Sequence, residues 1–223
     1  MKINRHGQAK VFTPEELESL FTIGLTNRRD RTLFAVMLFT ACRVKEACTL
    51  YSIDIYDRSG NVRPEMVFRK ANTKGKLATR SIPVAEDLRK MLADYFEDAG
   101  DLHLFPGREI DRSIDTDSVG RILRKACERI NVDGVSTHSF RRSALTHLSN
   151  SGIPLRIIQE VSGHRNLGQL QKYLEVRPEQ VRGAISALSM LSPLVTDLHP
   201  KGSAKQIDTE SVILRKFRLF FLS

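Results

Sequence analysis

The sequence predicts an α+β fold that is mainly helical, with a small antiparallel β-sheet or hairpin on one side of a helical domain. Two observations lead to this prediction. Apolar residues recur at helical spacing through most of the chain, in segments that begin with helix-capping residues. Residues 52–84 show a different pattern, in which short apolar runs lie between clusters of turn-forming residues.

Two helices are predicted in the first 40 residues. The segment Thr13-Pro14-Glu15-Glu16 is a strong helix start, because Thr13 can serve as N-cap and Pro14 suits the first helical position. Glu16 then completes a capping box with Thr13. The next helix starts near Arg28, and its residues from Leu33 to Phe39 are nearly all apolar. A helix that is apolar on most sides is expected at the centre of the core.

Residues 52–84 are expected to form the sheet. Turn formers at 57–61 and a Thr-Lys-Gly-Lys turn at 73–76 separate its apolar residues, which are Ile53, Ile55, Met66, Phe68, Ile82 and Val84. After Pro83 helical spacing resumes, with one apolar stripe made of Leu88, Met91, Leu92, Tyr95 and Phe96. Residues 99–115 contain Gly100, Pro106 and Gly107 and are predicted to be a loop.

Three further helices are predicted from their capping residues. The first begins at Asp117 or Ser118 and runs to about Ile130, the second begins at Ser136 or Thr137 and continues through Leu148, and the third follows Pro154 to about Val161. Further helical segments are expected to reach Leu191.

The chain is predicted to contain one domain, residues 1–192, followed by a linker and tail at 193–223. Within the tail, residues 212–222 are both apolar and basic. Such a stripe is expected to dock either on a neighbouring subunit or on its own domain. Both alternatives remain open at this stage.

The charge balance indicates a polyanionic partner. The chain carries a formal net charge of +9 and has a pI of about 9.7, and Lys and Arg contacts to phosphate dominate non-specific nucleic-acid affinity. A basic solvated surface, a ribosomal protein or a membrane-surface protein would have the same balance. We expect a nucleic acid as the partner, with no membrane and no small-molecule substrate.

The cysteines and the chain start indicate a cytoplasmic protein. Cys42, Cys48 and Cys127 form no CxxC pair and no metal-ligand spacing, so we expect reduced thiols packed as small apolar groups. The first residues lack the apolar stretch of a secretory signal, and no run is long enough to span a membrane. Together with the expected partner, this predicts a cytoplasmic, nucleoid-associated protein.

Six side chains could converge on one phosphate. His138 and Arg141 project from one helix face because they are three residues apart, His164 follows a Ser-Gly turn, and Tyr173 comes nine residues later. The set is completed by Arg43, at a predicted helix start, and Lys74, in the hairpin turn. Guanidinium groups match the paired oxygens of a phosphodiester and offset the charge of its transition state. Such a site would need no metal and no cofactor. Read singly, each arginine is an ordinary surface residue, and Tyr173 and the histidines could be structural.

The motifs that carry these residues resemble those of the tyrosine recombinases or phage-type integrases, from about Phe12 to about Ser192. TACRVKEACTL is similar to the first arginine box of that family, including the glutamate that is here Glu46. TKGKLATRSIPV resembles the catalytic β-hairpin, and THSFRRSALTHLSNSG the His-x-x-Arg box. VSGHRN followed by QKYLEV resembles the second histidine and the nucleophile.

The resemblance implies a role for each residue. Tyr173 would attack the scissile phosphate, form a 3′-phosphotyrosyl link and expel a 5′-hydroxyl. Arg43 and Arg141 would hold the non-bridging oxygens, while Lys74 would protonate the leaving oxygen. His138 would handle the tyrosine proton, and His164 would donate a hydrogen bond to the phosphate. The family also implies double-stranded DNA as the partner, a tetramer on that DNA, and integration or excision of a mobile element.

Several alternatives stay open. Lys76 could replace Lys74 as the catalytic lysine, because hairpin length does not decide which of them points inward. The separate helical domain that usually precedes the catalytic domain has no counterpart in this sequence, so we expect it to be absent. The chain could therefore be a truncated, non-catalytic DNA-binding relative, and a topoisomerase-like DNA-relaxing enzyme is the third possibility. Ala41, Arg142 and Ser162 depart from residues frequent in the family.

Overall fold

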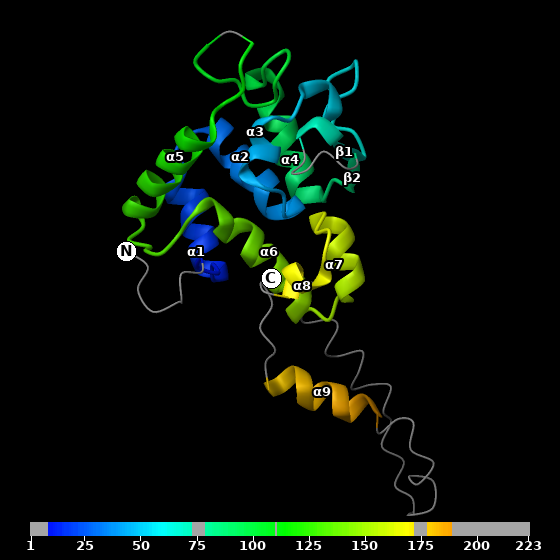
Figure 1. The fold of residues 1–223 in the computed structure, drawn as a ribbon. Helices are drawn as coiled ribbons and strands as arrows, with labels where there is room; N and C mark the ends of the chain where they lie inside the picture. Colours follow the sequence, from blue (N-terminus) through cyan, green and yellow to red (C-terminus); the bar gives the residue numbers. More distant parts are fainter. Residues whose placement is uncertain (1–8, 73–78, 110, 172–177, 189–223) are drawn as a thin grey trace, which may run out of the picture. The chain divides into compact units, whose positions relative to one another are not determined.

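A computed structural model describes residues 9–72, 79–109, 111–171 and 178–188 of the chain (Figure 1). The chain divides into two compact units, residues 1–176 and 177–223, and each is described by itself. In the second unit the described residues form one helix, α9 (Pro178–Leu188). All other described elements belong to the first unit. No helix within the described ranges is both long and apolar enough to cross a membrane.

The first predicted helix is confirmed together with its capping box. Thr13 is the N-cap of α1 (Pro14–Ser19), and the Glu16 N–H donates to Thr13 Oγ1 at 3.2 Å. In return, the Thr13 N–H donates to the Glu16 side chain at 3.0 Å. A π-helical turn, η1 (Leu20–Gly24), continues directly from α1. These local bonds satisfy N–H groups that a helix start would otherwise leave without partners.

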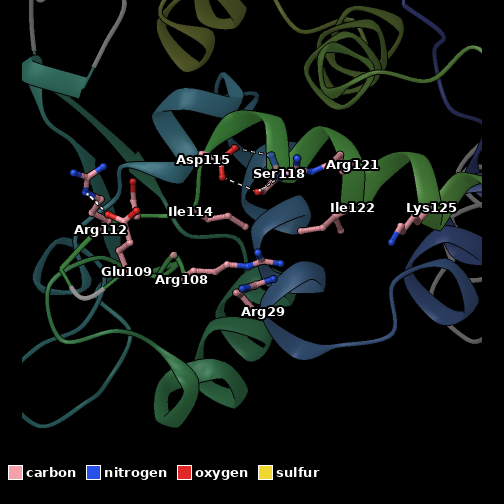
Figure 2. A pocket seen from close by; sticks show the side chains of 12 residues that line it. Arg29, Arg108, Glu109, Arg112, Ile114, Asp115, Ser118, Arg121, Ile122 and Lys125 are labelled. Carbon is pink, nitrogen blue, oxygen red and sulfur yellow. Dashed lines mark hydrogen bonds and ion pairs between the residues drawn. The ribbon is translucent and has the colours of Figure 1, made fainter.

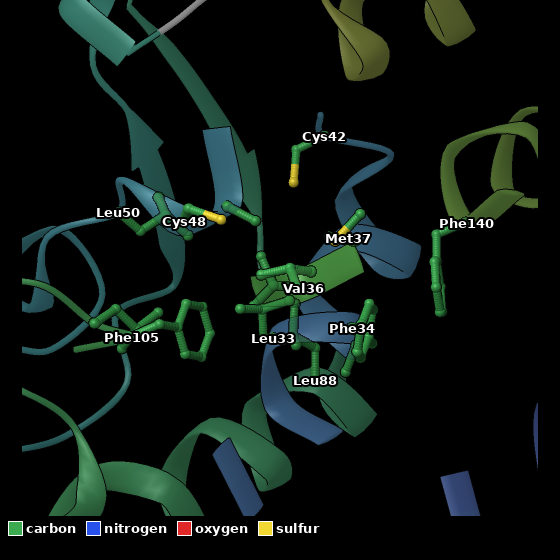
Figure 3. Close-up of a cluster of buried hydrophobic side chains, with 14 of the residues drawn as sticks. Leu33, Phe34, Val36, Met37, Cys42, Cys48, Leu50, Leu88, Phe105 and Phe140 are labelled. Carbon is green, nitrogen blue, oxygen red and sulfur yellow. The ribbon is translucent and has the colours of Figure 1, made fainter. Parts of the chain in front are cut away.

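The central helix of the core is α2 (Arg28–Thr40), as predicted. Leu33, Phe34, Val36 and Met37 are all at most 1% exposed, and Figure 3 shows them inside the main cluster of apolar side chains. The helix packs against α4 (Glu86–Tyr95) and α6 (Thr137–Asn150). The Phe34 ring stacks on Phe140 of α6 with the ring centres 4.9 Å apart. Burial on several sides is what its nearly continuous apolar sequence predicts.

The small antiparallel sheet is also confirmed. It consists of β1 (Glu65–Phe68) and β2 (Arg80–Pro83), with Met66 opposite Ile82. Both of these side chains face the core and are nearly fully buried. Ile53 differs from the expectation, because it lies in the 3₁₀ helix η2 (Ser52–Asp54) and is 65% exposed. The turn at 73–76 lies outside the described residues.

The remaining elements follow the predicted order with one corrected boundary. They are α3 (Val44–Cys48), η3 (Lys70–Asn72), η4 (Phe96–Asp98), α5 (Thr116–Arg129), α7 (Leu155–Ser162) and α8 (Leu167–Gln171). The N-cap of α5 is Asp115, not Asp117 or Ser118, because the Ser118 N–H donates to Asp115 Oδ1 at 2.7 Å. An aspartate earlier in the chain therefore caps the helix, and Ser118 occupies its first turn.

The three cysteines are free thiols and all are buried, in agreement with the expected apolar packing. Burial raises the pKa of the Cys42 and Cys127 thiols to about 11 and that of Cys48 to about 12. All three are therefore protonated at neutral pH and have little nucleophilic character.

Leu33→Ala should test the central position of α2. Leu33 is 1% exposed, so its truncation should leave a cavity and lower the free energy of unfolding by about 2–5 kcal/mol, measured by urea denaturation. Leu102→Ala is the matched control, since Leu102 is 47% exposed and its truncation should change stability by less than about 0.5 kcal/mol. Equal losses in the two variants would show that α2 is not the core helix.

Candidate active site

Arg141 is the most deeply buried charged side chain at the candidate site. It lies in α6 and is 2% exposed. Its Nη1 donates to the carbonyl oxygen of Ala41, and its Nη2 donates to the carbonyl oxygen of Ser162 at 2.8 Å. The same Nη2 lies 3.1 Å from Nε2 of His164. One guanidinium group therefore joins the end of α2, the end of α7 and the residue that follows α7.

The end of α2 is shaped to present its carbonyl group to this guanidinium. Ala41 is the C-cap of α2 and adopts a left-handed backbone conformation, with φ of 49°. A Cβ atom makes that conformation costly, which gives a reason why a glycine often stands here in the family that the motif resembles. The chain keeps the turn with alanine, and Ala41 is itself buried.

Arg43 and Glu46 form the second part of the site. Arg43 is the N-cap of α3, and its N–H donates to Glu46 Oε2 at 2.9 Å. Its Nη1 also donates to Glu46 Oε1 at 3.0 Å. The Glu46 side chain is 2% exposed, whereas the Arg43 side chain is 26% exposed. The buried carboxylate thus orients an arginine that still reaches solvent.

Arg80 is a site residue that the sequence reasoning missed. It lies at the start of β2, and its Nη2 is 3.5 Å from Glu46 Oε2. Its guanidinium carbon lies 4.8 Å from the centre of the Phe68 ring, and its side chain is 13% exposed. Alternation along the strand could have revealed it, because residues 80 and 82 share one face and Ile82 is an apolar core residue.

His164 lies against Arg141 in a buried environment. It is 6% exposed, its Nδ1 is 2.8 Å from Ser162 Oγ, and its carbonyl oxygen accepts from Gln159 Nε2 at 2.9 Å. Burial, followed by the charges of Arg141, Arg43 and Arg80, lowers the pKa of its ring to about 4, against the opposing charge of Glu46. The ring is therefore neutral at neutral pH, and the nitrogen that faces Arg141 can accept its N–H.

These five side chains are called the arginine cluster from here on; its members are Arg43, Glu46, Arg80, Arg141 and His164. Three guanidinium groups share one carboxylate and one neutral imidazole, so positive charge exceeds negative charge by two. Burial, followed by the charge of Arg43, lowers the pKa of Arg141 to about 10. The cluster is consequently a site of uncompensated positive charge, suited to an anion.

The structure describes four of the six predicted residues and brings three of these four together. It brings Arg43, Arg141 and His164 together in the arginine cluster. His138 lies in the first turn of α6, three residues before Arg141, and is exposed. Lys74, its alternative Lys76 and Tyr173 lie outside the described residues.

A second basic region lies between the start of α2, the loop before α5 and α5 itself. Figure 2 shows its pocket, which has a volume of about 590 Å³. The charged residues that line it are Arg29, Arg108, Glu109, Arg112, Asp115, Arg121 and Lys125. Glu109 pairs with Arg112 at 2.9 Å, and Asp115 accepts from the N–H of Ser118. Neither Arg108 nor Lys125 has an ion-pair partner within the part of the chain that the structure describes.

The fold and the arginine cluster together define a helical α+β domain with a largely buried, positively charged site. The family model "Phage integrase family" matches residues 10–180, which is most of the chain. The chain therefore belongs to the phage integrase family.

Curated relatives and solved structures agree with this assignment. The chain is 29% identical over 179 residues to a tyrosine recombinase of Pseudothermotoga lettingae, covering 78% of this chain and 59% of the relative. It is 28% identical to tyrosine recombinase XerA of Pyrococcus furiosus, covering 83% and 64%. The crystal structure of XerA recombinase superposes with a TM-score of 0.65 at 22% identity, covering 82% and 65%. The chain thus spans about three fifths of these relatives.

The neutral state of His164 predicts a pH dependence of stability. In the folded chain the pKa of His164 is about 4, whereas a histidine in the unfolded chain has a pKa of about 6.5. The unfolded chain therefore binds the proton first as the pH falls, so the free energy of unfolding should decrease from pH 6.5 to pH 4.

The measurement is urea denaturation at several pH values, with His164→Asn as the comparison. The difference in unfolding free energy between the native chain and this variant should shrink as the pH falls through that window. A difference that stays constant with pH would show that His164 is not held in its neutral form.

Proposed function

We propose that this chain is the catalytic part of a tyrosine-type site-specific DNA recombinase, which cuts and rejoins strands through a 3′-phosphotyrosyl intermediate. The observation that carries the proposal is the arginine cluster, whose positive charge exceeds its negative charge by two. A phosphodiester carries one negative charge, and its pentacoordinate transition state carries about two. A site preorganised with this excess favours the transition state over the ground state.

The proposed roles follow the chemistry of each group. Arg43 and Arg141 bind the non-bridging oxygens, since guanidinium groups pair with them in a fork geometry. Tyr173 attacks phosphorus, His138 handles its proton and Lys74 protonates the leaving 5′ oxygen. A phenol with a pKa of about 10 is a good leaving group when a DNA hydroxyl returns, so rejoining needs no external energy source. His164 hydrogen-bonds the phosphate through its one N–H, which requires the ring to give up its contact with Arg141 or with Ser162 when DNA binds.

The proposed partner is double-stranded DNA. The net charge of +9 supports it, and so do two solved structures of similar fold. One is XerH "bound to palindromic difH substrate", with a TM-score of 0.64 at 19% identity. The other is Tn1549 transposon integrase in complex with transposon right end DNA, with a TM-score of 0.64 at 16% identity. By analogy we propose that the chain moves a mobile element by integration or excision, in the cytoplasm at the nucleoid.

Self-association on DNA is part of the proposal. Three exposed apolar side chains, Val181, Ile185 and Leu188, recur at helical spacing along α9. An exposed stripe of this kind is suited to docking on another subunit. We propose a tetramer on DNA in which α9, at the end of the proposed catalytic domain (residues 1–192), and the linker and docking tail (residues 193–223) both contact a neighbouring subunit.

A covalent protein–DNA complex is the most direct test of the chemistry. Duplexes with a nick beside the scissile phosphate, built from repeats that flank the coding sequence in its source genome, should trap the native chain in a denaturant-resistant product. Tyr173→Phe should form none, because it lacks the attacking oxygen. Tyr51→Phe is the matched control and should react like the native chain. DNA binding by the native chain without any covalent product would favour a non-catalytic relative.

The pocket beside α5 predicts a salt-dependent contribution to DNA affinity. Arg108→Gln combined with Lys125→Gln should remove two phosphate contacts and reduce the slope of log binding constant against log salt by about 0.9 per contact. Covalent product at saturating protein should be unchanged, because neither residue belongs to the arginine cluster.

The control for this double variant is Arg58→Gln combined with Lys90→Gln, which removes the same charge from exposed positions that do not line the pocket. Fluorescence anisotropy over a range of salt concentrations measures both slopes. Equal reductions in the two double variants would show that net charge, and not the pocket, accounts for the effect.

A further inference from the structure

We infer that Arg80 is a positioning residue of the active site, which fixes Glu46 and the Gly163 turn relative to each other and thereby orients Arg43 and His164. The inference rests on the proposed function and extends it to a residue outside the six predicted ones. Arg80 is not proposed to touch the reacting atoms. It acts through Glu46 and Gly163, which its guanidinium group contacts.

The first contact is with Glu46. This buried carboxylate lies between two guanidinium groups, with Arg43 Nη1 at 3.0 Å from Oε1 and Arg80 Nη2 at 3.5 Å from Oε2. A buried carboxylate held from two sides has a fixed orientation, and Arg43 takes its orientation from that carboxylate. Loss of Arg80 would leave Glu46 bound only by the backbone N–H and the Nη1 of Arg43, so the Glu46–Arg43 pair would lose its contact with β2 and the Arg43 guanidinium would be held less firmly.

The second contact is with the turn that carries His164. Gly163 ends α7 in a left-handed conformation with φ of 63°. A Cβ built on Gly163 would clash with Arg80 Nη1, so a larger residue here would force the end of the Arg80 side chain to move, and the positive φ itself favours glycine. His164 is the next residue, and its ring contacts Arg141. The Arg80 guanidinium therefore lies between Glu46 and the turn at Gly163 that precedes His164.

Stability alone does not account for this arrangement. Nε and Nη2 of Arg80 are buried and have no hydrogen-bond partner in the described part of the chain; the contact to Glu46 is within ion-pair distance but lacks hydrogen-bond geometry. Buried donors without partners destabilise the folded chain, and burial lowers the pKa of this guanidinium. An apolar side chain packed on Phe68 would serve a purely structural purpose at least as well.

The test compares Arg80→Met with the native chain and with Arg80→Lys. Methionine keeps the packing on Phe68 but removes the charge, so the melting temperature should be unchanged or higher. The rate of covalent complex formation at saturating DNA should fall on the order of 100-fold, because small misplacements of catalytic groups have effects of that size. Arg80→Lys should restore part of the rate. A lower melting temperature with an unchanged rate would overturn the inference.

A readout without DNA separates this inference from the proposed function. Arg80 is one of the charges that lower the pKa of His164, so nuclear magnetic resonance titration of Arg80→Met should show His164 protonating at a higher pH than in the native chain. An unchanged titration would mean that Arg80 does not act on His164. Failure of the DNA reaction in the native chain would instead count against the proposed function.

Gly163 and Gly152 provide a matched pair of variants that tests the close approach of Arg80 to the Gly163 backbone. Gly163→Ala adds a Cβ against Arg80, whereas Gly152→Ala adds one at a similar φ of 75° with no heavy atom within 4 Å. Gly163→Ala should therefore slow covalent complex formation more than Gly152→Ala does. In an Arg80→Ala background the space is open, and the two glycine variants should differ much less. An equal difference in both backgrounds would show that Gly163 and Arg80 are not coupled.

Discussion

The burial of the Arg141 guanidinium is the constraint on which the rest of the site depends. A cation that is 2% exposed must have its N–H groups satisfied by the protein. The carbonyl oxygens of Ala41 and Ser162 do this, so α2 and α7 must end where they do. The left-handed conformation at Ala41 and the αL turn at Gly163 are consequences of this requirement. His164 is brought against Arg141 by the same turn.

The electrostatics of the site follow from that packing. Burial, and then the positive groups held close together, lower the pKa of Arg141 and of His164, and a single carboxylate, Glu46, opposes the charge effect. The folded chain thus keeps a region of excess positive charge away from water, where an anion is bound more strongly than in bulk solvent. A scissile phosphate entering the site would supply the missing negative charge. The positive electrostatic potential that the proposed reaction needs is therefore already present in the folded chain before DNA binds.

Much of the fold was predictable because its signals are local. The capping box at Thr13, the apolar run of α2 and the alternation around Met66 and Ile82 depend on neighbouring residues, and the structure has each of them as predicted. The N-cap of α5 was misplaced, because Asp115, Asp117 and Ser118 are all acceptable caps by type and only the backbone path distinguishes them.

The site was predictable only in part, because it is assembled by tertiary contacts. Helical spacing puts His138 and Arg141 in one turn, but it does not reveal that Arg141 is buried while His138 is exposed. Arg80 was not predicted, although it alternates with the apolar residue Ile82 along one strand, and this alternation places both side chains on the inner face. The roles of Lys74, His138 and Tyr173 stay predictions.

The central claim is tested most directly by a crystal structure of Tyr173→Phe bound to a cognate duplex. We expect the non-bridging oxygens of the scissile phosphate within hydrogen-bond distance of the Arg43 and Arg141 guanidinium groups. A scissile phosphate bound away from both would contradict the account.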